Sequence, residues 1–347
     1  MERRRHQARR THKANRSKNG QAPVYAAIDL GTNNCRLLVA KPMGATFKVI
    51  DSFSRIVRLG EGLTASGKLT DDAIERTTEA LKVCAQKIKR HKTQFIRSVA
   101  TEACRQASNS QTFFDHIKNE TGVHLEAIAA EEEAYLTLAG CLPLIDGNTD
   151  HALVFDIGGG STEIMWIAKD DQGTPVLHDT ISIQVGVVSL AERFGHGTVS
   201  PENYQKIIER ITPELDNFDH RHEISRHITD GNVQMLGTSG TVTTLAGIHL
   251  DLPRYDRSIV DGLSVGFESI TAIVSRVANM DYETRCAHPC IRHERADLMI
   301  MGCAILDAIC RRWLVGQLRV ADRGIREGIL TAMMMANNTP QPTAAAS

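Results

Sequence analysis

Two short segments of the sequence combine glycine with hydroxyl and amide residues in a pattern that suits phosphate binding. Residues 29–34 read DLGTNN and residues 156–163 read DIGGGSTE. Glycine allows a tight turn and a close approach of the backbone to a ligand, and successive backbone N–H groups can cradle an anion. The phosphate-binding residues predicted here are Gly31, Thr32, Asn33, Gly158, Gly159, Gly160, Ser161 and Thr162.

Three carboxylates accompany these two turns. Asp29 and Asp156 each end an apolar stretch, and Glu163 follows on the returning stretch. Carboxylates beside a phosphate loop suit a hard, oxygen-seeking cation such as Mg²⁺. A glycine-rich hairpin with an acidic rim is the alternative interpretation, and a single Asp-x-Gly is a common turn. The second copy of the pattern raises the specificity of the first.

The two segments belong to an internal repeat. Residues 26–38 read AAIDLGTNNCRLL and residues 153–165 read LVFDIGGGSTEIM, so each is an apolar strand, a small polar turn and a second strand. A duplicated unit of this kind predicts two similar domains that face a shared cleft. Asp29 would then face Asp156 across that cleft, and each domain would contribute one phosphate-binding hairpin.

A third glycine loop lies at residues 237–241, between an apolar stretch at 233–236 and a predicted helix at 242–250. The first N–H groups of a helix are unpaired and form an anion site. The loop lacks the Gly-Lys-Ser/Thr ending of a Walker A motif, and a plain strand-to-helix turn is the alternative. The candidates for phosphate binding in this loop are Gly237, Ser239, Gly240 and Thr241.

The segment 131–133 contains three adjacent glutamates. An acidic, solvated first turn of a helix is the ordinary explanation, because negative charge suits the N-terminal end of the helix dipole. The segment lies between the two Asp-Gly hairpins, however, where a carboxylate could activate a water molecule against a bound phosphate. Arg105, Arg295 and Arg326 are candidates for bidentate phosphate binding, with surface ion pairs as the alternative.

Cys286, His288, Cys290 and His293 lie close together and invite a zinc interpretation. Their spacing, with Pro289 inside, differs from a CxxC knuckle, and no second pair follows at a finger-like distance. We therefore interpret this segment as a loop that leads into the next helix.

The elements that must position these residues alternate between strand and helix, which predicts an α/β fold. Short apolar strands are expected at residues 24–28 and 35–40. Apolar residues recur at helical spacing in 71–92 and again in 294–314, which predicts two long helices. The first of these has an acidic start and a basic end, as the helix dipole favours.

Length and charge restrict the classes of protein to which this chain can belong. The chain has 347 residues and a net charge of −1. Residues 1–20 carry eight Lys or Arg against one Glu, which is +7, and the remainder carries 32 basic and 40 acidic residues, which is −8. Residues 1–22 and 337–347 are expected to be disordered tails. The basic arm could contact polyanions, although a solvated tail is the ordinary interpretation.

No apolar run approaches the ~18 residues of a membrane helix, and the N-terminus lacks the apolar core of a secretory signal. Eight cysteines are too few for a disulfide scaffold. We expect a cytoplasmic protein with reduced thiols, no membrane association and no specific nucleic-acid partner.

The motifs together resemble the Ppx/GppA family of exopolyphosphatases and guanosine pentaphosphate phosphatases. The resemblance covers about residues 24–330, and the order of its motifs is specific although each is weak alone. The matching segments are 27–33, 57–63, 100–105, 132–134, 156–163, 237–244, 294–297 and 323–328.

The resemblance implies two ribonuclease-H-like domains of the actin-like ATPase superfold around an interdomain cleft. The first domain is expected at residues 23–131 and the second at 132–319, with a helix at about 320–336 that returns to the first. Larger members add a helical domain, so this chain is expected to be a short form.

The resemblance also implies roles for individual residues. Glu133 aligns with the catalytic glutamate, assisted by Glu163, and Asp29 and Asp156 align with carboxylates that hold Mg²⁺ or Mn²⁺. Arg105 is expected to hold phosphate. Ala129 and Ala130 stand where the family commonly has Ser-Gly, and Tyr135 stands where Arg is common. If the family's Arg at that place contacts substrate, turnover or chain-length preference is expected to be altered in this chain.

The function expected is hydrolysis of the terminal phosphoanhydride of inorganic polyphosphate. Hydrolysis of guanosine pentaphosphate (pppGpp) in the same site is the first alternative. A non-catalytic sensor of polyphosphate or guanosine penta- or tetraphosphate is the second, and a sugar-kinase-like phosphotransferase is the third. The resemblance also implies a homodimer.

Overall fold

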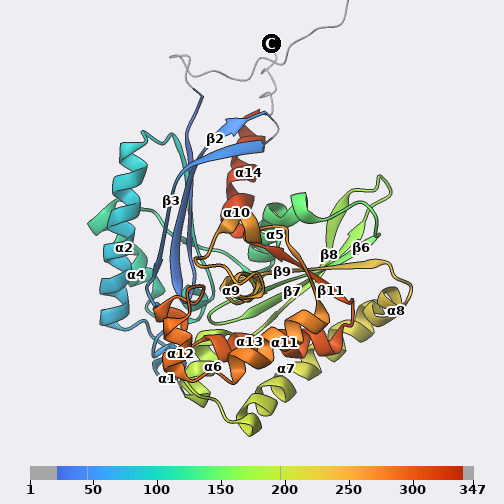
Figure 1. Ribbon diagram of the computed structural model, residues 1–347. Coiled ribbons are helices and arrows are strands. Elements are labelled where there is room, and N and C mark those ends of the chain that lie inside the picture. The colour runs from blue at the N-terminus through green and yellow to red at the C-terminus, as the bar shows by residue number, and fades with distance from the viewer. Residues whose placement is uncertain (1–21, 45, 196, 339–347) are drawn as a thin grey trace, which may run out of the picture.

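The structure is a computed structural model that describes residues 22–44, 46–195 and 197–338. Its strands form two separate sheets with helices on both faces of each, which is the α/β arrangement predicted (Figure 1). Nearly all of the basic arm lies outside the described residues. The last helix extends to Asn338, and the remainder of the predicted C-terminal tail also lies outside them.

The first sheet has five strands in the order β3-β2-β1-β4-β5. β1 pairs antiparallel with β2, β2 pairs antiparallel with β3, and β1, β4 and β5 are parallel. The strands are β1 (Tyr25–Leu30), β2 (Asn34–Met43), β3 (Thr46–Ile56), β4 (Phe95–Ala100) and β5 (Glu126–Ala127).

The second sheet repeats this plan and adds one edge strand, in the order β10-β11-β9-β6-β7-β8. β6, β7 and β8 are antiparallel neighbours, whereas β6, β9 and β11 are parallel. β6 thus corresponds to β1, and the sequence repeat is a repeat of topology. The strands are β6 (His151–Ile157), β7 (Thr162–Lys169), β8 (Pro175–Ile183), β9 (Val233–Thr238), β10 (Ser264–Gly266) and β11 (Gln317–Ala321).

Four hydrophobic cores hold the helices on the sheets. One face of the first sheet packs against α2 (Asp71–Arg90) and α4 (Ser110–Thr121), and the other packs against α14 (Ile325–Asn338). One face of the second sheet packs against α7 (Pro201–His222), α9 (Gly240–His249), α11 (Phe267–Ala278) and α13 (Met299–Arg312), and the other against α5 (Ala130–Cys141). Figure 1 shows α2 and α4 on the outside of the first sheet.

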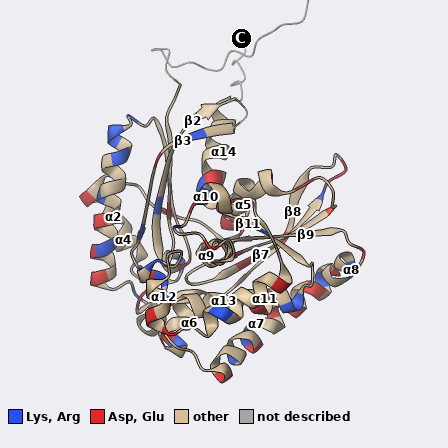
Figure 2. Ribbon diagram, viewed as in Figure 1, with Lys and Arg blue, Asp and Glu red and all other residues tan. Residues whose placement is uncertain are grey.

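Short helices complete the described chain. They are α1 (Leu63–Ser66), α3 (Glu102–Gln106), α6 (Val187–Phe194), α8 (Ile224–Thr229), α10 (Arg257–Val260) and α12 (Tyr282–Ala287), with the 3-10 turns η1 (Leu142–Leu144) and η2 (His293–Arg295). The outer helices α2 and α7 carry charges of both signs (Figure 2). No helix among the described residues is long and apolar enough to cross a bilayer.

The helix predicted at 71–92 is confirmed as α2, within two residues. Thr70 caps it by accepting a hydrogen bond from the Ala73 N–H, and acidic residues occupy its first turn. The helix predicted from residue 294 to 314 instead begins at Met299 and ends at Arg312. Residues 293–295 form η2, and this segment contacts Arg58 and Asn34 of the other half and Arg285 of its own half.

The two sheets are joined where α5 and α14 cross. Leu136 of α5 packs into the core with α14, whereas Ala134 and Leu138 pack against the second sheet. A Cβ at Gly328 would overlap the Leu136 carbonyl, and one at Gly140 would overlap the Gly324 carbonyl. The glycines therefore allow the two helices to approach at backbone distance. The helix expected from about residue 320 begins at Ile325, after β11.

Candidate active site

A cleft of about 810 Å³, including its open mouth, lies between the two sheets. Both copies of the repeat line it, together with α5 and the first turn of α9. Of the residues predicted for the site, those that line the cleft are Asp29, Gly31, Thr32, Asn33, Glu133, Asp156, Gly158, Gly159, Gly160, Ser161, Glu163, Ser239, Gly240 and Thr241.

The first hairpin joins β1 to β2. The Gly31 N–H donates to the Asn34 carbonyl at 2.9 Å, which closes the turn, and Thr32 and Asn33 at its tip are buried. Asp29 is paired across the hairpin with Arg36. Because residues directly opposite in a sheet point to the same face, Arg36 also lines the cleft.

The second hairpin, which joins β6 to β7, has the same geometry. The Gly158 N–H donates to the Ser161 carbonyl at 2.9 Å, and Asp156 is paired across the hairpin with Glu163. Glu163 is 3% exposed and accepts hydrogen bonds from Ser161 Oγ at 2.6 Å and Ser182 Oγ at 3.0 Å. The carboxylate is therefore oriented by two hydroxyl groups.

The tips of the two hairpins are in contact. A Cβ at Gly159 would lie 2.9 Å from Thr32 Cβ and 3.2 Å from the Asn33 nitrogen, and one at Gly160 would lie 3.0 Å from Thr32 Oγ1. Any side chain at these two positions would push the tips apart. The glycines of the second turn thus make room for the side chains of the first, and the cleft is closed at this point.

Glu133 approaches this contact from the first turn of α5 and is 7% exposed. Arg105 Nη1 donates to Glu133 Oε2 at 2.6 Å and to the Ile128 carbonyl at 3.0 Å. Arg105 Nη2 donates to Glu102 Oε2 at 2.6 Å. Arg105 is therefore shared between two carboxylates and lies behind Glu133, outside the cleft lining, so in this structure it orients Glu133.

Burial and neighbouring negative charges raise the pKa values of the carboxylates in the cleft. Burial raises the pKa of Asp29, and burial with the charge of Asp29 raises that of Asp156 to about 6, while Arg36 opposes both. Burial and the charge of Asp156 raise the pKa of Glu163 to about 7. Burial and the charge of Glu163 raise the pKa of Glu133 well above its usual value, against Arg105. The cleft thus concentrates negative charge away from water.

Arginine supplies the opposite charge from the second half of the molecule. Arg295 lies against the N-terminus of α9, where a Cβ at Gly240 would overlap its guanidinium group. Arg295 Nη2 donates to Asn34 Oδ1 at 3.3 Å, and its buried Nε has no partner among the described atoms. Burial and the charges of Arg36 and Arg292 lower the pKa of Arg295 to about 10. The group therefore has hydrogen-bonding capacity for an anion.

Four predicted residues do not line the cleft. Arg105 is one of them. Thr162 donates to the Val185 carbonyl at 2.7 Å, and Gly237 lies against the Phe155 ring inside the second sheet. Arg326 lies in the first turn of α14, where its charge lowers the pKa of Asp29.

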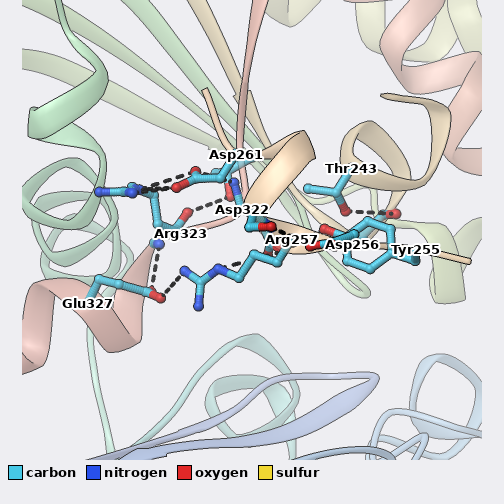
Figure 3. Close-up of polar contacts among 12 residues, drawn as sticks. Thr243, Tyr255, Asp256, Arg257, Asp261, Asp322, Arg323 and Glu327 are labelled. Carbon is cyan, nitrogen blue, oxygen red and sulfur yellow. Dashed lines mark hydrogen bonds and ion pairs between the residues drawn. The ribbon is translucent and has the colours of Figure 1, made fainter. Parts of the chain in front are cut away.

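The turn that carries Arg326 is held by a polar network (Figure 3). Glu327 accepts from Arg257 Nη2 at 2.6 Å and from the Gly324 N–H at 3.0 Å, and Tyr255 Oη donates to Asp322 Oδ2 at 2.5 Å. Arg323 is ion-paired with Asp261. These contacts attach the start of α14 to the loop that follows α9.

Four polar residues of the lining were not predicted as site residues: Asn34, Arg36, Thr101 and Glu102. Arg36 is the most important, and its signal was present in the hairpin register, since it stands opposite Asp29. Thr101 and Glu102 follow β4, which is parallel to β1, so they reach the same edge of the sheet. The Cys286–His293 segment lies elsewhere, and the Cys290 thiol donates to the Leu252 carbonyl at 3.2 Å.

Comparisons with known proteins agree with this architecture. Residues 38–337 match the model of the Ppx/GppA phosphatase family. The chain is 30% identical over 329 residues to exopolyphosphatase 2 of Mycobacterium tuberculosis, covering 89% of this chain and 98% of that protein. It is 26% identical to the guanosine-5'-triphosphate,3'-diphosphate pyrophosphatase of Photobacterium profundum, covering 91% of this chain and 60% of that protein.

Solved structures give the same result. The Aquifex aeolicus Ppx/GppA family member superposes with a TM-score of 0.75 at 26% identity, covering 92% of this chain and all of that one. An exopolyphosphatase from Cytophaga hutchinsonii superposes with a TM-score of 0.81 at 22% identity, covering 90% and 98%. The predicted two-domain actin-like fold is thereby confirmed. The chain belongs to the Ppx/GppA phosphatase family.

Proposed function

We propose that this chain releases the terminal phosphate of inorganic polyphosphate by attack of a water molecule that Glu133 activates. The observation that carries the proposal is the position of Glu133, a buried carboxylate in the same cleft as both glycine turns. The general class of reaction follows from the relatives named above. The chain is a phosphoanhydride hydrolase of the exopolyphosphatase or pppGpp phosphatase type.

The residues of the cleft divide the work of this reaction. The backbone N–H groups of the two turns, with Thr32 and Ser161, would hold the transferring phosphoryl group in line with the attacking water. Glu133 would accept the proton of that water. Its raised pKa favours this role, because a general base is most effective when its pKa lies near the working pH. Arg105 would keep the carboxylate aimed through its 2.6 Å hydrogen bond.

We propose that Asp29 and Asp156 hold Mg²⁺ or Mn²⁺. Both line the cleft, from opposite halves, and burial raises the pKa of both. A bound cation would stabilise the two carboxylates in their charged form. Within residues 22–338, as far as they are described, no three His, Cys, Asp or Glu are arranged to hold a metal. Phosphate oxygens and water would therefore complete the shell, as is usual for Mg²⁺. The bound cation would neutralise phosphate charge.

The lining of the cleft favours polyphosphate over a nucleotide. Its apolar members are Ile157, Val187, Leu298, Met299 and Ile325, so the described lining includes no aromatic ring to stack on a guanine. Hydrolysis of pppGpp remains the second candidate, because the Photobacterium relative is named for a guanosine substrate. The homodimer and the cytoplasmic location remain predictions.

Phosphate release from polyphosphate and from pppGpp by the purified chain tests the proposal. Glu133→Gln should lower release by roughly 10² or more with the fold intact, the usual contribution of a general base. Glu131→Gln is the matched control, since Glu131 is exposed on the same helical turn. Unchanged turnover in Glu133→Gln would contradict the mechanism. Tight polyphosphate binding without hydrolysis at any Mg²⁺ or Mn²⁺ concentration would instead indicate a sensor.

A further inference from the structure

A second contact between the halves lies at the loop of residues 57–62, which we name the bridging loop. Its backbone is attached to the tip of the first hairpin. The Val57 and Arg58 N–H groups both donate to the Asn33 carbonyl, at 2.9 and 3.1 Å, and the Gly60 N–H donates to the Thr32 carbonyl at 2.9 Å. Three backbone hydrogen bonds therefore join the bridging loop to the first phosphate turn.

The same loop reaches across to the second half of the molecule. Arg58 Nη2 donates to the Glu294 carbonyl at 3.2 Å and forms an ion pair with Asp297 at 3.0 Å. The Gly62 N–H donates to Glu192 Oε1 at 2.7 Å. Asp297 is 6% exposed, whereas the Arg58 side chain is 32% exposed. The bridging loop thus connects the first turn to α6 and to the segment before α13.

Arg58 contacts residues that lie on both sides of Arg295 in the chain. Its two partners, Glu294 and Asp297, flank the arginine that lines the cleft beside the α9 N-terminus. A second arginine contacts the same segment. The fully buried Arg285 donates a hydrogen bond from Nε to the Ala296 carbonyl at 3.0 Å. Arg285 belongs to the same half as Arg295, so its hold is independent of closure. Like the hydrogen bond from Arg295 Nη2 to Asn34 Oδ1, the contacts of Arg58 require the two halves to be close.

The backbone of Arg58 supports a special role. Its φ of 48° lies in the left-handed region. Residues other than glycine rarely adopt this conformation, and they keep it where surrounding contacts enforce it. Here the Arg58 N–H donates to the Asn33 carbonyl at 3.1 Å, and the Arg58 carbonyl accepts from the Glu61 N–H at 3.1 Å. The backbone of Arg58 is therefore held by its own half, in the conformation from which its side chain reaches Glu294 and Asp297 of the other half.

We propose that Arg58 is a positioning residue that fixes Arg295 relative to the first phosphate turn when the cleft closes. The inference rests on the proposed function, because it concerns the distance between the two anion-binding sides of the proposed active-site cleft. Without Arg58, each half keeps its own phosphate-binding groups. One of the contacts that set their separation is then lost, while the Arg295–Asn34 and Gly62–Glu192 hydrogen bonds remain, and a ligand that bridges the two sides binds more weakly.

The test is the Arg58→Ala variant of the full chain with tripolyphosphate as the probe. Alanine has the same backbone preference as arginine at this position, so the change isolates the side chain. Loss of hydrogen bonds to a charged partner should raise KM about tenfold, with kcat altered less than about threefold and the melting temperature unchanged. Arg58→Lys should restore part of the affinity. Arg226→Ala, an exposed ion-paired arginine of α8, is the control.

Two further measurements separate positioning from a general structural role. Asp297→Asn should raise KM in the wild-type background and have a much smaller effect in Arg58→Ala, since the pair is already broken. Small-angle X-ray scattering should give a larger radius of gyration for Arg58→Ala that tripolyphosphate restores only at higher concentration. Additive effects on KM, or identical scattering and KM for Arg58→Ala and wild type, overturn the inference.

Failure of the proposed function gives a different result. In that case the wild-type chain itself would release no phosphate from any phosphoanhydride. Tripolyphosphate binding measured by calorimetry would then still report whether Arg58→Ala weakens affinity about tenfold. Unchanged affinity would overturn the role of Arg58, whatever the reaction of the wild-type chain.

Discussion

The two hairpins at the cleft have the same backbone geometry but differ in the charges of their side chains. Asp29 and Asp156 occupy the same place in β1 and β6, and seven residues later the returning strands carry Arg36 in one copy and Glu163 in the other. Arg36 lowers the pKa of Asp29, whereas Asp156 and Glu163 are two like charges. One copy is thus suited to hold an anion and the other to handle a proton.

The tips differ as well, and the difference is complementary. Thr32 and Asn33 fill the first tip with side chains, whereas the second tip is bare glycine that fits around them. Two identical tips could not interlock in this way, because two sets of side chains would collide and two sets of glycines would leave a void. The two copies therefore share the scaffold, and the residues at which they differ shape the site.

Removal of the acid that distinguishes the second hairpin should have the largest effect. Glu163→Gln keeps the shape and the hydrogen bonds from Ser161 and Ser182 but loses the charge. If Glu163 assists proton transfer, kcat for phosphate release should fall by roughly 10². Glu214→Gln, on the exposed face of α7, is the control. A kcat within twofold of wild type would remove the functional contrast between the hairpins.

Close packing around Thr32 gives the next prediction. A Cβ at Gly60 would overlap Thr32 Cγ2, so Gly60→Ala should lose about 1–3 kcal/mol of unfolding free energy by overpacking. Adding Thr32→Ser removes the offending methyl group and should recover most of that stability in urea titrations. Gly147→Ala is the control, because nothing lies within 4 Å of its Cβ. A double variant no more stable than Gly60→Ala would show that the methyl group is not the cause.

Removal of Arg36, the basic residue of the first hairpin, should have a smaller effect on catalysis. Arg36 lines the cleft without an ion pair to any described residue, so Arg36→Gln removes a charge available to phosphate. Loss of one charge-assisted contact should raise KM about tenfold, with a smaller change in kcat. Lys41→Gln on the same strand is the control. A fall in kcat with KM unchanged would place Arg36 in the chemical step and make the two hairpins alike.

The sequence allowed prediction of the duplicated scaffold because its signal is local. Each copy places Asp, Gly and a small polar turn between two apolar strands, and the register of β1–β2 and β6–β7 follows from that spacing. Most predicted cleft residues line the cleft for the same reason. Gly237 and Thr162 do not, since residues alternate between the faces of a strand and a one-residue step turns a group inward.

Long-range contacts account for the rest. The segment before α13 contacts Asn34, Arg285 and Arg58, the last of which is more than 230 residues away in the chain. Local periodicity favours a helix from residue 294, whereas the structure has the turn η2 where these distant residues meet the segment. The hydrogen bond from Arg105 to Glu133 likewise joins two different helices, α3 and α5. No pattern in the sequence near either residue contains that information.

The third strands of the repeat allow the smallest and cleanest comparison. Ser182 of β8 stands opposite Glu163, and Ser54 of β3 stands opposite Arg36 in the same register. Ser182 Oγ donates to the Glu163 carboxylate at 3.0 Å, and this hydrogen bond stabilises the charged form and lowers the pKa. Ser182→Ala should therefore raise the Glu163 pKa further above about 7.

In the pH profile of kcat/KM, the acid limb should then move to higher pH by about half a unit to one unit, the range expected from one hydrogen bond to a charged group. Activity at pH 6 should fall more than activity at pH 8, because the ionised carboxylate is the working form and is lost first on the acid side. Ser54→Ala, the same change in the first copy, should leave the limb in place. A shift to lower pH, or equal shifts in both variants, would mean that Glu163 does not titrate in the reaction and that the charge difference between the hairpins serves binding alone.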